Sequence, residues 1–309
     1  MAICREFYFP SSDGSSRIHA AEWTPESGEI IGVLQIAHGV AEYGMRYAPF
    51  AEFMTEHGFA VVANDHLGHG KTAENEQELC FFAEKDGWND VVSDMDQLHK
   101  LTAAKYPGVP YFLFGHSMGS FYARWYAEKW PESITALIIS GTAGPSVMNA
   151  IGQRLAALIA AVKDNDAVSP LMVNLNFGSY CKRIPDAASP NAWLSRDTQV
   201  VRDYDADKLC TFSFTAGTYR EMLATLNHVS RKSWAEGIAK DLPILLIAGD
   251  ADPVGNYGAG VRTVWAMLGD AGVQDLTCQI YEGARHELHN ETNRQEVFDY
   301  VLTWIECHI

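Results

Sequence analysis

The stretch Gly115-His116-Ser117-Met118-Gly119 constrains this chain more than any other feature of its sequence. An apolar run over 109–114 leads into it, and residues 121–129 after it have a helical pattern. A G-x-S-x-G sequence between a strand and a helix places its serine at the tip of a sharp turn above a sheet. The glycines permit that turn because they lack a Cβ atom, and the helix N-terminus adds partial positive charge nearby. We therefore predict that Ser117 is a catalytic nucleophile.

Strands and helices alternate on both sides of this turn. Short apolar runs predict strands at 7–10, 17–23, 30–37, 59–63, 109–114, 134–140, 242–248 and 275–281. Apolar residues spaced near 3.6 predict helices at 47–57, 88–106, 121–129, 257–268 and 293–306. The first two strands flank a Ser-Asp-Gly turn and should form an antiparallel hairpin. The alternation after them predicts an α/β fold with a mostly parallel, doubly wound sheet.

The alternation stops at Gly141 and resumes near Leu242. Between them no buried strand is visible, and the pattern predicts helices, one with an apolar stripe at Val147, Ile151, Leu155, Leu158 and Val162. A second helix is expected over 219–229, with loops around Ser169-Pro170 and Ser189-Pro190. We predict a helical cap over 145–235, inserted into an α/β core made of 1–144 and 236–309.

Composition limits the partners of this chain. Its formal net charge of −16 disfavours binding to nucleic acid or to anionic membranes. No apolar run of about 18 residues is available for stable membrane insertion, and the N-terminus has no signal-peptide pattern. The six cysteines are dispersed without a C-x-x-C pair, which indicates neither a zinc site nor a disulfide framework. We expect a cytoplasmic protein that needs no metal or cofactor, and the oligomeric state stays open.

A serine hydroxyl needs a base and a carboxylate that orients the base. Asp252 and His286 both follow predicted strands, at the sheet edge where ligands of α/β proteins bind. The order Ser…Asp…His is that of α/β-hydrolases. His286 would accept the proton of Ser117, and Asp252 would orient the imidazole of His286.

Neighbouring residues offer alternatives for both partners. Asp250 could be the acid, although its place directly after the glycine that ends the strand favours a turn-forming role. His289 could be the base, although His286 lies closer to the end of its strand. A third group, Asp65 with His66 and His69, could hold a metal, but its spacing matches no strong zinc motif, and a structural loop is favoured.

The tetrahedral intermediate of acyl transfer needs N–H donors for its oxyanion. The residue after the nucleophile supplies one, which predicts the Met118 N–H. The loop after the strand at 30–37 supplies the other, and there we predict the Val40 N–H. Glu42 and Arg46, four residues apart in this region, could pair and brace the loop or be two separate surface charges.

Five blocks together resemble the monoacylglycerol lipase and lysophospholipase branch of the capped α/β-hydrolase serine esterases. They follow the order of that family and are 38–43 with 46–47, 65–70, 115–120, 249–254 and 285–291. The resemblance implies an α/β-hydrolase fold with a mobile cap. It also implies a triad of Ser117, Asp252 and His286, with Val40 and Met118 as the oxyanion hole. The cap matches only loosely, through the stretch 193–197.

The expected function is hydrolysis of a medium- or long-chain acyl ester, such as a monoacylglycerol or a lysophospholipid, through an acyl-enzyme on Ser117. Apolar cap residues including Leu155, Leu158, Phe177 and Phe214 could line an acyl tunnel or simply pack the cap. An aminopeptidase of the same fold is the alternative. It would bind a substrate ammonium through cap carboxylates, for which the candidates are Asp186, Asp197, Asp203, Asp205, Asp207 and Glu221. A non-catalytic ligand-binding protein is a weaker alternative, because no triad residue is missing.

Overall fold

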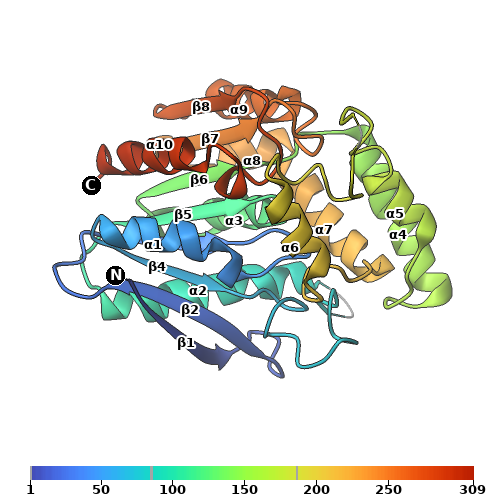
Figure 1. Cartoon of the computed structure of the whole chain (residues 1–309), viewed down its shortest axis with the longest axis horizontal. Helices are drawn as coiled ribbons and strands as arrows, with labels where there is room; N and C mark the ends of the chain where they lie inside the picture. The colour runs from blue at the N-terminus through green and yellow to red at the C-terminus, as the bar shows by residue number, and fades with distance from the viewer. Residues whose placement is uncertain (1, 84–85, 186) are drawn as a thin grey trace.

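The computed structural model describes residues 2–83, 86–185 and 187–309, and in this part of the chain eight strands form one sheet (Figure 1). The strands are β1 Ala2–Pro10, β2 Arg17–Pro25, β3 Gly32–Ala37, β4 Phe59–Asn64, β5 Tyr111–His116, β6 Ala136–Ser140, β7 Ile244–Gly249 and β8 Leu276–Tyr281. Their order is β1-β2-β4-β3-β5-β6-β7-β8. The β1–β2 and β2–β4 pairs are antiparallel and the others are parallel. The mostly parallel, doubly wound sheet is therefore confirmed.

The first hairpin is longer than its apolar pattern predicts. β1 begins at Ala2 rather than at residue 7, and it pairs with β2 over its full length, from Ala2 opposite Pro25 to Pro10 opposite Arg17. Most side chains of β1 are exposed, because it is the edge strand of the sheet. An edge strand does not need apolar residues, and charged ones there discourage pairing with other chains.

Helices cover both faces of the sheet. One face carries α1 Ala48–Glu56 and α10 Arg294–Glu306, and the other carries α2 Gly87–Lys105, α3 Met118–Lys129 and α9 Ala259–Asp270. Alternate residues of each central strand enter opposite cores: Leu113 packs with α2 and α3, whereas Phe114 packs with α1 and α10. Such strands are buried on both sides, which explains why they appear in the sequence as continuous apolar runs.

The chain between β6 and β7 is helical in its described part. Its helices are α4 Val147–Lys163, α5 Pro170–Phe177, α6 Thr198–Ala206, α7 Ala216–Val229 and α8 Lys232–Gly237. Figure 1 shows α4 to α7 gathered at one end of the sheet. The loop expected at Ser169-Pro170 is in fact the start of α5. Ser169 caps this helix by accepting a hydrogen bond from the Met172 N–H, and Pro170 occupies the first turn, where its missing N–H costs nothing.

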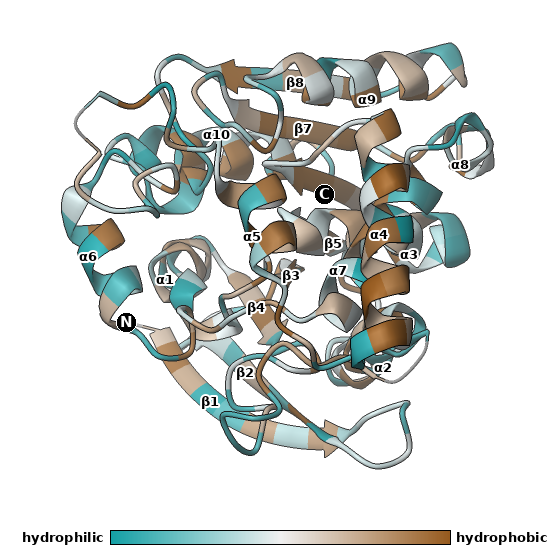
Figure 2. Cartoon of the chain, turned by 90° about the vertical axis from the view of Figure 1, so that its right-hand side faces the viewer, coloured by the Kyte–Doolittle hydropathy of each residue, from teal (hydrophilic) through white to brown (hydrophobic). Residues whose placement is uncertain are grey.

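The apolar stripe that predicts α4 is real, but most of it faces solvent. Val147 is 78% exposed, Leu158 61% and Val162 75%. The helix instead packs through Ala156, which is fully buried, and the neighbouring Leu155. In Figure 2 the hydrophobic residues of α4 and α5 are visible on the surface turned toward the viewer. Of the two leucines that could either line an acyl tunnel or pack the cap, Leu155 is partly buried in a hydrophobic cluster and Leu158 is exposed, and neither is among the described residues that line a cavity.

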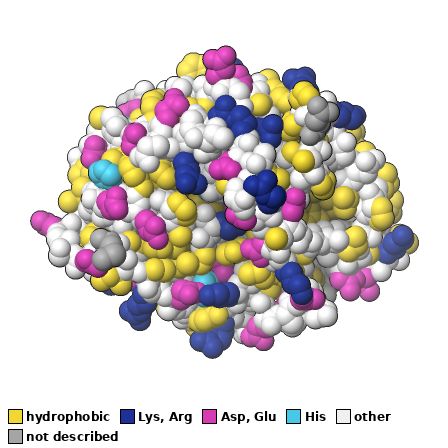
Figure 3. Space-filling view, in the orientation of Figure 1, with side chains coloured by type: hydrophobic (Ala, Val, Ile, Leu, Met, Phe, Trp, Pro, Cys, Tyr) yellow, Lys and Arg dark blue, Asp and Glu magenta, His cyan; other side chains and the backbone are white. Residues whose placement is uncertain are grey.

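Charged side chains are dispersed over the face of the molecule that Figure 3 shows. In the space-filling view, acidic residues lie among basic and uncharged ones without forming a single block (Figure 3). No helix within the described residues has the length and apolar character needed to cross a bilayer.

Candidate active site

Ser117 occupies a strained turn between β5 and α3. Its backbone has φ 52° and ψ −121°, a combination that is unfavourable for a residue with a side chain. The turn also brings the start of α3 against β3. A Cβ atom on Gly119 would lie 2.1 Å from the carbonyl oxygen of Ala37, and one on Gly115 would lie 2.6 Å from the Cβ of Ala123. The two flanking glycines are therefore required by close packing.

Asp252 and His286 meet beyond the carboxyl ends of β7 and β8. His286 Nδ1 lies 2.9 Å from Asp252 Oδ2, and both side chains are buried. The other oxygen of Asp252 accepts a hydrogen bond from the Val254 N–H at 2.8 Å, which fixes the carboxylate. Burial alone would lower the pKa of His286, but the Asp252 carboxylate outweighs it, and the pKa is raised above its ordinary value.

The structure separates the two candidate acids and the two candidate bases. Asp250 is exposed and accepts a hydrogen bond from the Gly283 N–H, so it braces a turn. The His289 ring is stacked on Tyr47 with 4.2 Å between centroids. Burial lowers the pKa of His289 to about 3. A cavity opens in front of Ser117, and His289 is not among the described residues that line it. Of these four residues, only His286 lines that cavity.

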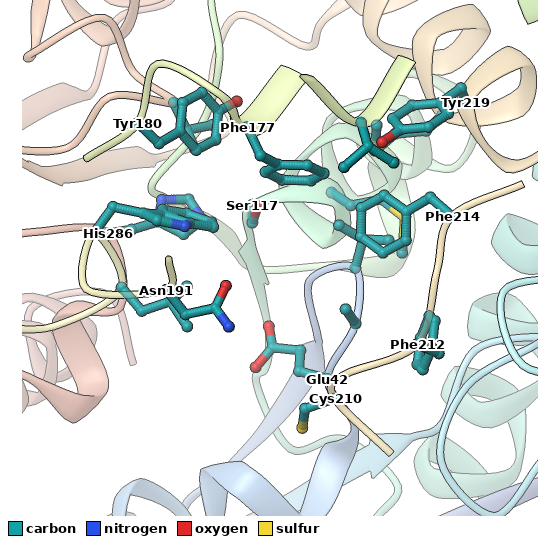
Figure 4. Close-up of a pocket in the computed structure, with 18 of the residues that line it drawn as sticks. Glu42, Ser117, Phe177, Tyr180, Asn191, Cys210, Phe212, Phe214, Tyr219 and His286 are labelled. Carbon is teal, nitrogen blue, oxygen red and sulfur yellow. The ribbon is translucent and has the colours of Figure 1, made fainter. Parts of the chain in front are cut away.

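A cavity of about 770 Å³ opens in front of Ser117 and His286. Val40 and Met118 also line it. In Figure 4, Phe177, Phe214 and Tyr219 lie on one side of Ser117, and Glu42 and Asn191 lie on the other. We call the side lined by Phe177, Phe214 and Tyr219 the aromatic branch of the cavity, and the side lined by Glu42 and Asn191 the polar branch.

The loop that carries Val40 lies directly against the serine. A Cβ atom on Gly39 would come within 3.0 Å of Ser117 Cβ and 2.6 Å of Glu42 Oε1. The backbone can approach the serine this closely because residue 39 is a glycine. The Val40 and Met118 backbones therefore border the same space beside Ser117.

Glu42 and Arg46 form a buried ion pair, which settles the alternative left open by the sequence. Arg46 Nη1 lies 3.0 Å from Glu42 Oε2. Arg46 also donates two hydrogen bonds to the carboxylate of Glu287, at 2.7 and 2.8 Å. Sequence reasoning did not identify Glu287, because its partner is 241 residues away and an acidic residue beside His286 has no local signature.

The remaining histidines of the glycine-rich loop are structural. The rings of His66 and His69 pack against His38, with centroids 4.1 and 5.3 Å away. Burial lowers the pKa of His66 to about 3 and that of His69 to about 4, so both are neutral. Asp65 accepts hydrogen bonds from the Gly44 and Lys71 backbones. Within the described residues, no group of three or more His, Cys, Asp or Glu side chains could hold a metal ion.

The helical segment between β6 and β7 holds the loop of His286. The His286 N–H donates to the Trp193 carbonyl at 3.4 Å, and the Glu287 N–H donates to the Leu194 carbonyl at 2.8 Å. The Trp193 ring lies 5.0 Å from the His286 ring. The stretch beginning at Trp193, which resembles the family only loosely, therefore contacts His286, the candidate base, directly.

Residues 28–293 match the family described as "Serine aminopeptidase, S33". The chain belongs to this family. One relative is a monoacylglycerol lipase from Mycolicibacterium smegmatis. It is 29% identical to this chain, and the alignment covers 96% of this chain and 95% of that protein. Another is the phospholipase YtpA of Bacillus subtilis, 25% identical, with 93% and 100% aligned.

Among solved structures, a thermostable carboxyl esterase from Bacillus coagulans in complex with glycerol superimposes with a TM-score of 0.92. It is 31% identical, and the match covers 99% of this chain and 98% of that one. The protein therefore has the α/β-hydrolase fold. It is a serine hydrolase of the carboxylesterase and monoacylglycerol lipase type.

Proposed function

We propose that this protein hydrolyses medium- or long-chain acyl esters of a neutral, hydroxyl-rich alcohol, such as monoacylglycerols, through an acyl-enzyme on Ser117. The observation that carries the proposal is the buried His286–Asp252 pair, which opens onto the same cavity as Ser117. Asp252 would keep the hydrogen on Nδ1 of His286, so that Nε2 is free to accept a proton.

The proposed reaction has two halves. His286 Nε2 takes the proton of Ser117 as the serine oxygen attacks the ester carbonyl, and it then gives that proton to the leaving alcohol. Water attacks the acyl-enzyme in the same way and releases the fatty acid. The Val40 and Met118 N–H groups would stabilise the oxyanion of each intermediate, and one such donor is worth about 3 kcal/mol of barrier.

The aromatic branch of the cavity supports a long acyl chain. The described cavity lining that comes from α5, α7 and the stretch before α7 is largely apolar; it includes Val173, Phe177, Phe212, Phe214, Leu223 and Leu226. Burying each methylene of a chain against such a surface is worth about 0.8 kcal/mol. We accordingly propose that residues 145–235 are a cap domain on a core of 1–144 and 236–309, and that the cap supplies most of the acyl site.

The polar branch supports a neutral leaving group rather than a phosphate. Glu42, Glu287 and Asn191 line it, and no lysine or arginine is among the described residues that line the cavity. A lysophospholipid phosphate would find no cationic side chain in this lining, whereas a hydroxyl of glycerol could donate a hydrogen bond to the amide oxygen of Asn191. Monoacylglycerols are therefore preferred over lysophospholipids in this proposal.

The amidase alternative has less support. The described cap carboxylates named as ammonium ligands, Asp197, Asp203, Asp205, Asp207 and Glu221, do not line the cavity. Asp186 lies outside the described residues. The acidic side chains that do line it, Glu42 and Glu287, are already bound to Arg46.

The test combines a covalent probe with a substrate series. A fluorophosphonate should label the wild-type protein at Ser117 and leave Ser117→Ala unlabelled. The kcat/KM for p-nitrophenyl esters should rise from acetate to decanoate, and monoacylglycerol should be hydrolysed faster than lysophosphatidylcholine of the same chain. Rates that are equal or fall with chain length would contradict the acyl site, and faster turnover of alanine p-nitroanilide than of any ester would favour the aminopeptidase.

A further inference from the structure

One guanidinium joins the two loops that flank Ser117. Arg46 contacts the carboxylate of Glu42, which lies in the loop after β3, and the carboxylate of Glu287, which follows His286. The two loops are far apart in the sequence, and Arg46 is hydrogen-bonded to both.

Glu42 fixes the backbone that precedes Val40. Its Oε1 accepts hydrogen bonds from the Gly39 N–H and from the Tyr47 hydroxyl, and its Oε2 faces Arg46. The carboxylate thus folds back onto its own loop and sets the direction in which the next N–H, that of Val40, points. Loss of the carboxylate would release this turn.

Glu287 fixes the loop of the base. Its carboxylate accepts two hydrogen bonds from Arg46 and one from the Asn290 side chain at 2.9 Å. Its backbone N–H is held by the Leu194 carbonyl. Glu287 is adjacent to His286, so a shift of its side chain would turn or displace the imidazole next to it.

The bridge is buried and therefore rigid. The side chains of Glu42 and Glu287 are 3% and 2% exposed, and that of Arg46 is 12% exposed. Arg46 also lies over the ring of Tyr204 on α6, 4.9 Å from its centroid. Burial raises the pKa of Glu42 even beside Arg46, whereas at Glu287 the Arg46 guanidinium outweighs burial and lowers the pKa, so Glu287 is the stronger anionic partner of the bridge. A planar guanidinium can bind one carboxylate with two donors and still reach another, which a lysine ammonium cannot do with the same geometry.

We propose that Arg46, together with Glu42 and Glu287, is a positioning residue that sets the Val40 N–H and the imidazole of His286 at a fixed separation around Ser117. The inference rests on the proposed function. Neither Arg46 nor its partners takes part in a bond-making step. Their role is to keep the oxyanion donor and the base in one geometry through both halves of the reaction.

Loss of the bridge should lower kcat, whereas a loss of substrate binding would raise KM. The aromatic branch of the cavity is remote from the bridge, so the KM for p-nitrophenyl decanoate should change little. A misplacement of catalytic groups by about 1 Å costs on the order of 100-fold in rate. Arg46→Ala should therefore lower kcat by about 100-fold for acetate and decanoate alike.

Chemical rescue provides the sharpest test. Arg46→Ala leaves a space between two buried carboxylates, and millimolar guanidinium chloride should occupy it and restore part of kcat, whereas sodium chloride at the same ionic strength should not. Arg46→Lys should keep part of the activity without rescue. Glu287→Gln preserves the shape of the side chain and leaves Arg46 in place, so it replaces Arg46→Ala in this test if that variant does not fold. It should lower kcat and leave KM unchanged.

Lys105→Met is the matched control, because it removes a partly buried ion pair with Glu22, between α2 and β2. It should lower stability and leave kcat unchanged.

A wild-type protein that neither hydrolyses esters nor reacts with fluorophosphonate would contradict the proposed function itself. An active wild type whose folded Arg46→Ala and Glu287→Gln variants keep kcat within about threefold, or change KM alone, would overturn the bridge while leaving the hydrolase proposal intact.

Discussion

Asp252 Oδ2 lies 2.9 Å from Nδ1 of His286, and both side chains are at most 3% exposed. At this distance, and with both groups buried, the carboxylate interacts with the imidazole far more strongly than a surface charge would, because little water screens the interaction. The pair fixes which nitrogen of the imidazole faces the cavity. The first two predictions depend on this contact.

Asp252→Asn should lower kcat for p-nitrophenyl butyrate by about 10⁴, because an amide at this position favours the wrong tautomer of His286. Asp250→Asn is the control, since Asp250 braces only the turn at Gly283. It should keep kcat within a few-fold of the wild type. Comparable losses in the two variants, measured by steady-state kinetics, would mean that the acid is wrongly assigned.

The pH dependence should report the same pair. Only neutral His286 can accept the proton of Ser117, so kcat/KM should rise with pH as the imidazole loses its proton. The pKa of His286 is raised by Asp252, so the midpoint should lie above 6.5. Other titratable groups near the ring are His116, Glu42 and Glu287. A flat profile between pH 5 and 8 would contradict the assignment of His286.

Much of this arrangement could be predicted from the sequence because its signals are local. The turn at Ser117 has flanking glycines that packing requires, and the central strands are buried on both faces, so their apolar runs are continuous. Likewise, the positions of Asp252 and His286 follow from where two apolar runs end.

Features that depend on distant contacts could not be predicted in this way. The apolar stripe of α4 predicts a helix but not which side of it is buried, and the buried side is formed around Ala156 instead. Glu287 pairs with Arg46 because the fold brings together the loop after β3 and the loop of His286, which are far apart in the sequence. The exposed edge strand β1 has no apolar pattern to reveal its first residues.

The aromatic branch of the cavity, where we propose that the acyl chain binds, can be narrowed at one residue. Met222 is half-buried on α7 and lines the cavity. Met222→Trp should fill part of the branch and lower kcat/KM for the decanoate ester by about 10-fold, as expected when a few methylenes no longer fit. The acetate ester should be unaffected.

Met267→Trp is the control for this change, because Met267 is also half-buried on a helix but does not line the cavity. It should leave the ratio of decanoate to acetate kcat/KM unchanged. A Met222→Trp variant that keeps the wild-type ratio of decanoate to acetate kcat/KM would mean that the acyl chain lies elsewhere.

Arg124 on α3 is fully buried and holds both ends of the helical segment. Its guanidinium donates to the Thr142 hydroxyl and the Ala143 carbonyl, where the chain leaves β6, and to the Val229 carbonyl at the end of α7. It also lies over the ring of Trp234, 4.4 Å from its centroid. Burial lowers the pKa of Arg124 to about 9, so it stays charged at neutral pH. No carboxylate pairs with it within the described residues, so its charge is balanced by carbonyl and hydroxyl dipoles.

Replacing this arginine tests whether the buried cation stabilises the fold. Arg124→Met fills a similar volume but leaves two carbonyls without their donor, and each unsatisfied buried group costs about 1–3 kcal/mol. We expect the free energy of unfolding in urea to fall by about 3 kcal/mol. Arg262→Met, at an exposed position on α9, should change it by less than about 0.5 kcal/mol. Buried ions can often be exchanged for apolar residues without loss. An Arg124→Met protein as stable as the wild type would therefore show that packing alone, and not the guanidinium, joins the helical segment to α3.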